Sequence, residues 1–477
     1  MALWLVLTPL CFALAAFATP SERVRPWLLP LAGATQLGLV AFELGAHGDA
    51  PTGQWLWLDP LGRLVVAYLA LLFFLCAAYA PGYLALRGER PNRIFCAVML
   101  VFFGMMNLIA GSQHLGLLWV AVEATTLASG PLLYFNRNAR SIEATWKYLL
   151  IGSVGIALAL LGTFFVAYSA LQAGVATSLL LPDVLASAKQ LSLPWLHAGF
   201  VLALVGYGTK MGLAPMHTWK PDAYGEAPGL VGALLAGGLT SCAFVAILRM
   251  FQILGAAGEA EFARALLLFL GLFSMAVAGA FMVRQGDYKR MLAYSSVEHM
   301  GILVLGIAIG GAGTFGALLH MLNNGLTKGV LFLSAGNIHR AYGSKRTDDV
   351  TGALRVLPAS GAFFLAGFFA ITGTPPFGPF VSEFTILSAI VHAERYGVAA
   401  AFLVLLVVVF VGMGGTVLAV VQGEPSERAL ATPYRDGWLS VGPIAVLLAL
   451  VLLLGLWIPA PLSALLNDAA RVVEGTH

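Results

Sequence analysis

The sequence predicts an all-α protein that crosses a membrane about fourteen times. Of its 477 residues, 59% are hydrophobic and only 10% are charged, whereas soluble domains carry about 25% charged residues. Mean hydropathy is +0.87, and apolar runs long enough to span a bilayer follow one another along the chain. Charged residues recur inside several of these runs, and glycine and proline interrupt two of them.

The apolar runs indicate where the membrane helices lie. They fall near residues 2–18, 27–46, 62–80, 92–110, 114–134, 145–170, 196–219, 229–255, 262–283, 291–311, 315–338, 356–391, 397–422 and 437–459. The first run lacks the basic residues that normally begin a signal peptide, so we expect a retained helix. These runs group into residues 1–91 with helices 1–3, two five-helix units at 92–256 and 257–422, and a last helix with a short tail at 423–477.

Basic residues are unequally distributed between the two sides of these predicted helices. The assignment places 18 Lys and Arg residues on one side and six on the other. The positive-inside rule makes the richer side cytoplasmic. Both termini are then expected on the outer side of a bacterial or archaeal cytoplasmic membrane.

Composition also excludes several classes of protein. A net charge of +3 is too small to indicate nucleic-acid binding. The four cysteines are scattered in apolar runs, without the spacing of zinc, iron–sulfur or haem sites. We therefore expect no metal, cofactor or redox centre in this chain.

Two predicted helices contain breaks. The seventh includes Gly212-Leu-Ala-Pro215, in which Pro215 is five residues after Lys210, and the twelfth includes Gly373-Thr-Pro-Pro-Phe-Gly-Pro379. Proline removes a helix hydrogen bond, and irregular backbone within a bilayer must be buried in protein or line a cavity. The two interrupted helices are the seventh and the twelfth, five positions apart in the order of helices. This spacing predicts two five-helix repeats of inverted topology, an arrangement typical of transporters.

Ionisable residues inside the apolar runs are the candidate functional residues, because a charge facing lipid costs roughly 2.5 kcal/mol or more. They are Glu123, Lys210, Glu298, His299, His320, Lys328 and Glu383, with His217 directly after the first break. Groups of alternating charge can pass protons when their proton affinities are tuned by burial and by one another. The alternative is that they form ion pairs that fix helix packing, and His217 could instead cap loosened backbone.

These residues lie in motifs that resemble a known family. Lys210-Met-Gly-Leu-Ala-Pro-Met-His-Thr-Trp-Lys-Pro-Asp-Ala223 with Glu226-Ala-Pro228, Asp287-Tyr-Lys-Arg-Met-Leu-Ala-Tyr-Ser-Ser296 and His320-Met-Leu-Asn-Asn-Gly-Leu-Thr-Lys328 are similar to the antiporter-like subunits. These are the proton-translocating subunits of complex I, membrane-bound hydrogenases and Mrp antiporters. Ser296-Val-Glu-His-Met-Gly301 and Pro375-Pro-Phe-Gly-Pro-Phe-Val-Ser-Glu-Phe384 most resemble membrane component F of hydrogenase-4.

The resemblance implies a role for each matching residue. Glu123 matches the fifth-helix glutamate that pairs with the seventh-helix lysine, here Lys210. Lys328 matches the central lysine of the eleventh helix, and Glu383 the residue that ends the path. Two departures stand out. Lys220 lies where the family usually has an apolar residue, and the eighth helix shows Ser241 near the place where several relatives carry lysine or histidine.

The resulting interpretation is a proton-translocating subunit of an energy-converting membrane oxidoreductase, of the hydrogenase-4 or formate-hydrogenlyase type. The electron chemistry would belong to partner membrane subunits of that assembly. Three alternatives remain at this point. They are an Mrp-like cation/proton antiporter that could also move sodium, the membrane half of an inorganic-carbon accumulating pair, and a structural membrane anchor.

Overall fold

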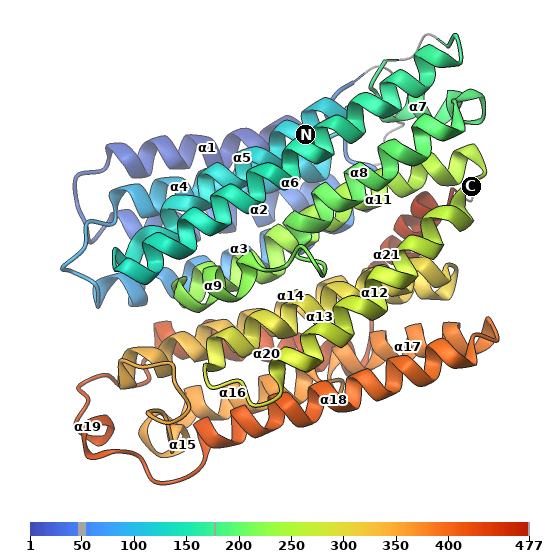
Figure 1. Ribbon diagram of the computed structural model, residues 1–477. Helices are drawn as coiled ribbons and strands as arrows, with labels where there is room; N and C mark the ends of the chain where they lie inside the picture. Colours follow the sequence, from blue (N-terminus) through green and yellow to red (C-terminus); the bar gives the residue numbers. More distant parts are fainter. Residues whose placement is uncertain (46–53, 176–177, 476–477) are drawn as a thin grey trace.

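The fold is a bundle of long helices that run roughly side by side (Figure 1). The computed structural model describes residues 1–45, 54–175 and 178–475. Within these ranges, ten helices are long and apolar enough to cross a membrane. The chain is therefore an all-helical, multi-pass membrane protein, as its composition predicted.

Helix boundaries follow the apolar runs closely. The first half contains α1 (Ala2–Ala18), η1 (Arg25–Trp27), α2 (Leu28–Gly45), α3 (Pro60–Ala85), α4 (Arg93–Gly111), α5 (Leu115–Leu133), η2 (Tyr134–Asn136), α6 (Ala139–Gln172), α7 (Leu181–Ser187), η3 (Ala188–Gln190), α8 (Leu193–Met211), α9 (Trp219–Glu226), α10 (Gly229–Leu234), η4 (Leu235–Leu239) and α11 (Thr240–Ala257). The second half contains α12 (Ala260–Met282), α13 (Tyr288–Ile309), α14 (Ala312–Tyr342), α15 (Ala353–Val356), α16 (Pro358–Ile371), α17 (Gly378–His392), α18 (Tyr396–Val421), α19 (Glu427–Leu430), α20 (Trp438–Leu456) and α21 (Ala460–Glu474).

Both predicted breaks are present. Helix α8 ends at Met211, because Gly212 adopts a left-handed φ of +81°, and α9 begins only at Trp219. In the second half, α16 ends at Ile371 and α17 begins at Gly378. Glycine reaches the left-handed region without steric cost, and proline cannot continue the helix hydrogen bonding.

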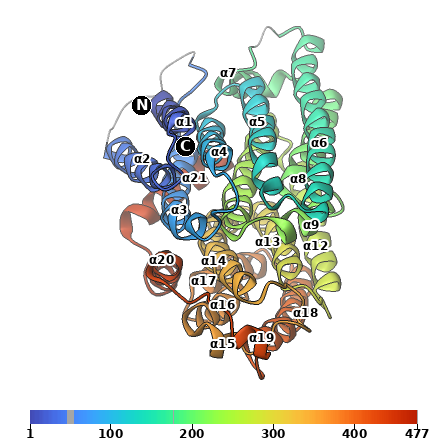
Figure 2. The same ribbon diagram turned by 90° about the vertical axis from the view of Figure 1, so that its left-hand side faces the viewer.

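Helix α14 occupies the interior of the second half. It packs against α10, α13, α16, α17 and α20, and Figure 2 shows α13, α16 and α17 next to it in an end-on view. Its polar residues His320, Asn324 and Lys328 are all at most 1% exposed. The strong packing of this helix therefore holds polar groups inside the bundle.

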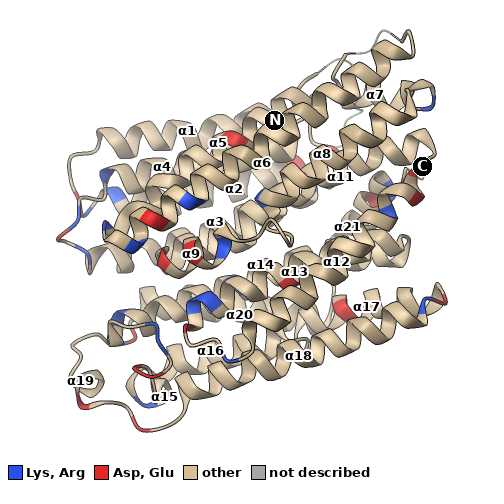
Figure 3. Cartoon of the chain, in the orientation of Figure 1, with Lys and Arg blue, Asp and Glu red and all other residues tan. Residues whose placement is uncertain are grey.

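The two ends of the bundle differ in charge. Backbone bridges join Leu56 to Ser112 and His114 to Leu180 at one end, whereas Asp287 pairs with Arg346 at the other. At that second end, Lys345 forms an ion pair with Glu226 at 2.5 Å. Figure 3 shows that charged residues gather at the helix ends, with more of them at this end, which also carries α15 and α19.

The segment after α20 is helical. Helix α21 buries Leu466, Ala469 and Val473 and packs against α3, α11 and α14. The sequence had predicted only a short tail here, because an amphipathic helix of this length lacks the continuous apolar run of a membrane span.

Candidate functional site

Lys210 lies at the end of α8, immediately before the first break, and is 1% exposed. Its Nζ donates hydrogen bonds to Thr126 Oγ1 and to the Tyr148 hydroxyl, both at 2.7 Å. The same nitrogen lies 4.5 Å from the centre of the Tyr148 ring. Two hydroxyls from α5 and α6 therefore hold the lysine, and either of them can accept a proton or pass one on.

Glu123 lies one turn before Thr126 on α5. Its Oε1 accepts a hydrogen bond from Ser153 Oγ at 3.0 Å, while Oε2 is buried and has no hydrogen-bond partner among the described residues. The carboxylate is close enough to attract the Lys210 ammonium. The hydrogen bonds of the ammonium, however, go to Thr126 and Tyr148 and not to Glu123, so the pairing of Glu123 with Lys210 that the resemblance implies stays a prediction.

Lys220 is a second buried lysine at the same break. It lies on the first turn of α9 with no measurable exposure, and its Nζ is 3.1 Å from Ser296 Oγ on α13. A Cβ added to Gly212 would lie 2.7 Å from this Nζ. The lysine side chain therefore fills the space that the break opens.

Lys328 binds α13 at Ser295, the residue next to Ser296. Its Nζ donates to Ser295 Oγ at 2.7 Å and to the Leu292 carbonyl at 3.4 Å. The Glu298 carboxylate, one turn further along α13, is close enough to attract it. Two consecutive serines thus bind the two lysines, one from α9 and one from α14.

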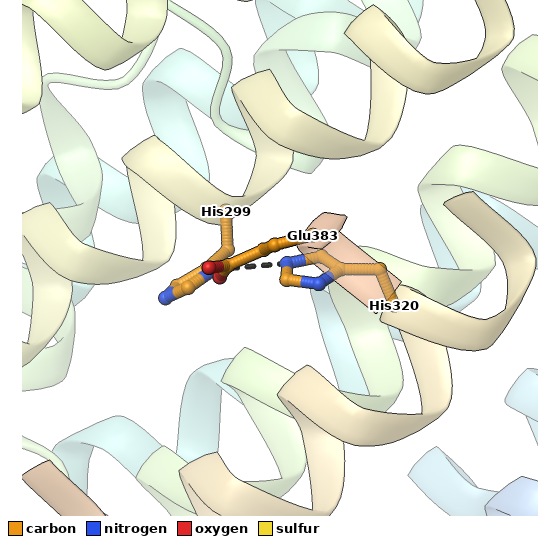
Figure 4. A group of neighbouring side chains, drawn as sticks. All are labelled: His299, His320 and Glu383. Atoms are coloured by element: carbon orange, nitrogen blue, oxygen red, sulfur yellow. Dashed lines mark hydrogen bonds between the residues drawn. The ribbon is translucent and has the colours of Figure 1, made fainter. Parts of the chain in front are cut away.

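A cluster of His299, His320 and Glu383 lies further along the same interior, toward the second break (Figure 4). His299 Nδ1 and His320 Nε2 are 3.0 Å apart, and His320 Nδ1 lies 2.9 Å from Ser382 Oγ. Glu383 Oε1 and His299 Nε2 are buried and have no hydrogen-bond partner in the described chain. Helices α13, α14 and α17 each supply one member of this cluster.

His217 has different neighbours from the other candidate residues. It belongs to the first break, and its ring faces Phe281 and Tyr294, with centroids 6.5 and 6.2 Å away. Its Nδ1 is buried without a hydrogen-bond partner among the described residues. The other residues predicted from the sequence fall into two groups, with Glu123 and Lys210 among α5, α6 and α8 and the rest among α13, α14 and α17. No hydrogen bond joins His217 to either group in the described chain.

Comparisons with known proteins identify the family. The model of the family described as "NADH:quinone oxidoreductase/Mrp antiporter, TM" matches residues 112–410. A hydrogenase-4 component F homolog of Methylacidiphilum infernorum is 35% identical over 468 residues, which cover 95% of this chain and 96% of that protein. This chain belongs to that antiporter-like family.

Other members and solved structures extend the match. The antiporter-like chain is 31% identical to an NADH-quinone oxidoreductase subunit N of Desulforudis audaxviator, over 74% of this chain and 70% of that one. The structure of an Mrp complex from a Dietzia species superposes with a TM-score of 0.86 at 20% identity, covering 99% and 98% of the two chains. Respiratory complex I from Thermus thermophilus with bound aureothin gives 0.77 at 25% identity, covering 96% and 97%.

Not every buried charge in this antiporter-like subunit belongs to the candidate site. Arg249 binds Asp59 through two hydrogen bonds of 2.5 and 2.7 Å, and both side chains are buried. This bidentate pair ties α11 to the start of α3 and leaves no free charge. It contrasts with Lys210, Lys220 and Lys328, whose hydrogen-bond partners are hydroxyls and a carbonyl.

The sequence pattern did not mark Lys220 as buried. It stands between a tryptophan and a proline and two residues before Asp222, which resembles the polar end of a helix. Its one signal was the departure from the family motif, where an apolar residue is usual. Thr126, Tyr148, Ser295 and Ser296 were also missed, because hydroxyl residues are common in membrane helices and only tertiary contacts show their partners.

Proposed function

We propose that this antiporter-like subunit translocates protons through the buried polar run between its two broken helices. The run comprises Glu123, Lys210, Lys328, Glu298, His299, His320 and Glu383, with His217 near its first break. The single observation that carries this proposal is that Lys210 and Lys328 are buried with short hydrogen bonds to hydroxyls and without a direct carboxylate ion pair among the described residues. A lysine that donates hydrogen bonds to hydroxyl groups has neighbouring oxygens to which its proton can move.

Electrostatics would couple the steps. When a neighbouring subunit draws charge toward or away from Glu123, the attraction on Lys210 changes, and Lys210 then gains or releases its proton. The proton moves to Lys328 and on through Glu298, His299 and His320 to Glu383. Moving one charge against 100 mV costs about 2.3 kcal/mol, and a pKa change of two units corresponds to about 2.7 kcal/mol. Changes of this ordinary size therefore suffice to drive the transfer.

The architecture supports the same proposal. Fourteen crossings would arise from the ten long helices together with the shorter and interrupted segments. Residues 92–256 and 257–422 would form two inverted five-helix repeats, each containing one break. The end of the bundle with more charged residues would face the cytoplasm, and both termini would then lie outside.

Partners would supply the electron chemistry. The likeness to a hydrogenase-4 component F homolog favours membrane subunits of a hydrogenase-like assembly over those of the other complexes. An inorganic-carbon accumulating pair would instead bring a soluble zinc protein. An affinity tag on this chain, followed by identification of the copurifying subunits, distinguishes these two assemblies.

The decisive experiment is proton uptake by vesicles that contain the intact, affinity-purified complex during electron transfer. We expect uptake that persists without sodium and stops when Lys328 is replaced by methionine, with assembly verified separately. Uptake that requires sodium would favour the Mrp-like cation/proton antiporter. Unchanged uptake in the assembled Lys328→Met complex would leave these residues as structural elements of a membrane anchor.

A further inference from the structure

The cluster of His299, His320 and Glu383 has the composition of a metal site. Each residue offers one ligand atom, these atoms lie within 4.8 Å of one another, and all three side chains are at most 5% exposed. We propose that this cluster binds a divalent transition-metal cation of the Zn²⁺ type, and that the bound ion blocks proton transfer. The second statement rests on the proposed function, whereas the first does not.

The donor set fits Zn²⁺ better than the common hard cations. Two imidazole nitrogens and one carboxylate are zinc ligands, and a fourth position can hold water, whereas Mg²⁺ and Ca²⁺ select oxygen ligands. Zinc–ligand bonds of about 2.0–2.1 Å place tetrahedral ligand atoms roughly 3.3 Å apart. The 3.0 Å between His299 Nδ1 and His320 Nε2 is close to this value. A Glu383 carboxylate oxygen lies within 4.8 Å of a ring nitrogen of each histidine, and it would move closer to become the third ligand.

A neighbouring side chain lies beside each imidazole. Ser382 Oγ contacts His320 Nδ1 at 2.9 Å, which leaves His320 Nε2 directed at the cluster. His299 would bind through Nδ1 with its hydrogen on Nε2. Glu298 Oε2 lies 3.7 Å from that nitrogen, which is beyond hydrogen-bond distance, so a shift of the carboxylate on metal binding would be needed before Nε2–H is donated in the way usual for metal-bound histidines. Glu383 Oε1, which has no hydrogen-bond partner in the described chain, would bind the metal.

A bound dication would stop the proton path, because it replaces the hydrogen bond between His299 and His320, so the imidazoles can no longer exchange a proton. The ion is therefore an inhibitor of transport and not a cofactor.

Direct binding tests the site without turnover. Equilibrium dialysis of the purified full chain against radioactive Zn²⁺ should give one tight equivalent per chain. His320→Gln and Glu383→Gln should each raise the dissociation constant of that site at least tenfold, and Glu298→Gln should raise it about 10- to 100-fold. His197→Gln is the matched control, because His197 pairs with Glu259 at 3.0 Å in a partly exposed position away from the cluster, and it should change nothing.

Zn²⁺ binding that is the same in wild type, His320→Gln and Glu383→Gln would overturn the site. In vesicles with the intact complex, Zn²⁺ should reduce wild-type proton uptake at least tenfold and a chelator should restore it. If Zn²⁺ binds through these residues yet leaves uptake unchanged, the metal site stands, the block is refuted, and the place of Glu383 in the proton path fails with it.

An independent observation concerns Lys220. It is fully buried, and no carboxylate forms an ion pair with it in the described chain. Its Nζ contacts Ser296, while Lys328 contacts the adjacent Ser295. Leaving a charge buried without a counter-ion costs several kcal/mol, so a purely structural role is poorly explained.

We infer that Lys220 carries protons between Lys210 and Lys328 in this chain, an assignment that rests on the proposed function. Its side chain lies over Gly212, two residues after Lys210, and reaches α13 beside the contact of Lys328. The eighth predicted membrane helix, near residues 229–255, is formed by α10, η4 and α11. Its only Lys or Arg is Arg249, whose charge is neutralised by Asp59. Lys220 therefore extends from the first break, whose Gly212 lies two residues after Lys210, to the serine beside the one that binds Lys328.

Two substitutions separate a carrier from a structural cation. Lys220→Met removes the proton site and Lys220→Arg keeps the charge but does not release it; both should lower uptake at least tenfold in assembled complexes. A structural cation predicts that arginine restores uptake and methionine does not. If uptake is normal in both Lys220 variants but blocked in Lys328→Met, only the role of Lys220 is refuted. Normal uptake in all three refutes the proposed path itself.

Discussion

Replacement of Lys210 by arginine tests whether this residue moves protons or only holds charge. Lysine and arginine have similar reach, and both are cations at neutral pH. Their reference pKa values differ by about 2–3 units. In one environment, the deprotonated form of arginine is therefore roughly 100 to 1,000 times rarer. If uptake depends on Lys210 releasing its proton, the rate should fall by at least about 100-fold.

The structure indicates what this substitution costs in stability. Lys210 has two hydroxyl acceptors, Thr126 Oγ1 and Tyr148 OH, whereas a guanidinium has five N–H donors. Donors that remain unsatisfied in a buried site cost about 1–3 kcal/mol. We expect the complex to assemble with a lowered melting temperature, so uptake must be normalised to the amount of assembled complex.

The assay is proton uptake in vesicles containing the intact complex during electron transfer. Lys147→Arg is the matched control, because Lys147 is half exposed and pairs with Glu143 at 2.6 Å and Asp222 at 2.9 Å. Arginine should preserve these ion pairs and normal uptake. Near-normal uptake by assembled Lys210→Arg would make Lys210 a structural cation and would refute the relay through it.

Three further outcomes are expected. Glu383→Gln retains the volume and hydrogen bonds but removes the titratable proton, so the complex should assemble without uptake; full uptake would reject Glu383 as part of the path. Gly373→Ala should reproduce this loss, because Gly373 has φ +66° and an added Cβ would overlap the Glu383 carboxylate; uptake equal to wild type would show that the carboxylate can move away. Asp59→Asn leaves Arg249 buried and unpaired, which should destabilise the complex by about 3–5 kcal/mol, with a lower melting temperature and normal uptake per assembled complex; an unchanged melting temperature would contradict the structural role of this pair.

Local chemistry explains which parts of the fold could be predicted from the sequence. Helix boundaries follow apolar runs because each run must cross the bilayer or lie in its core. The breaks follow Gly212 and Pro215 in one helix and Gly373 and Pro375 in another, because these residues act on their own backbone. None of this requires knowledge of distant neighbours, so a single sequence carries it.

Contacts between helices are a different kind of information. The resemblance implied Glu123 as the partner of Lys210, whereas the hydrogen bonds of the ammonium go to Thr126 and Tyr148. Lys220 has an ordinary polar setting in the sequence and a fully buried one in the fold. Both differences arise from how α5, α6, α9 and α13 pack, which depends on the whole bundle.

The two serines on α13 show how such contacts can create a connection that no motif records. Adjacent residues on a helix point in directions about 100° apart, because one turn takes 3.6 residues. Ser295 can therefore bind Lys328 of α14 while Ser296 binds Lys220 of α9. A lysine on the short helix after the first break and the lysine at the centre of the second half thus bind adjacent positions of one helix. The proposed path needs a link at this point, and the inference that Lys220 provides it rests on these two contacts.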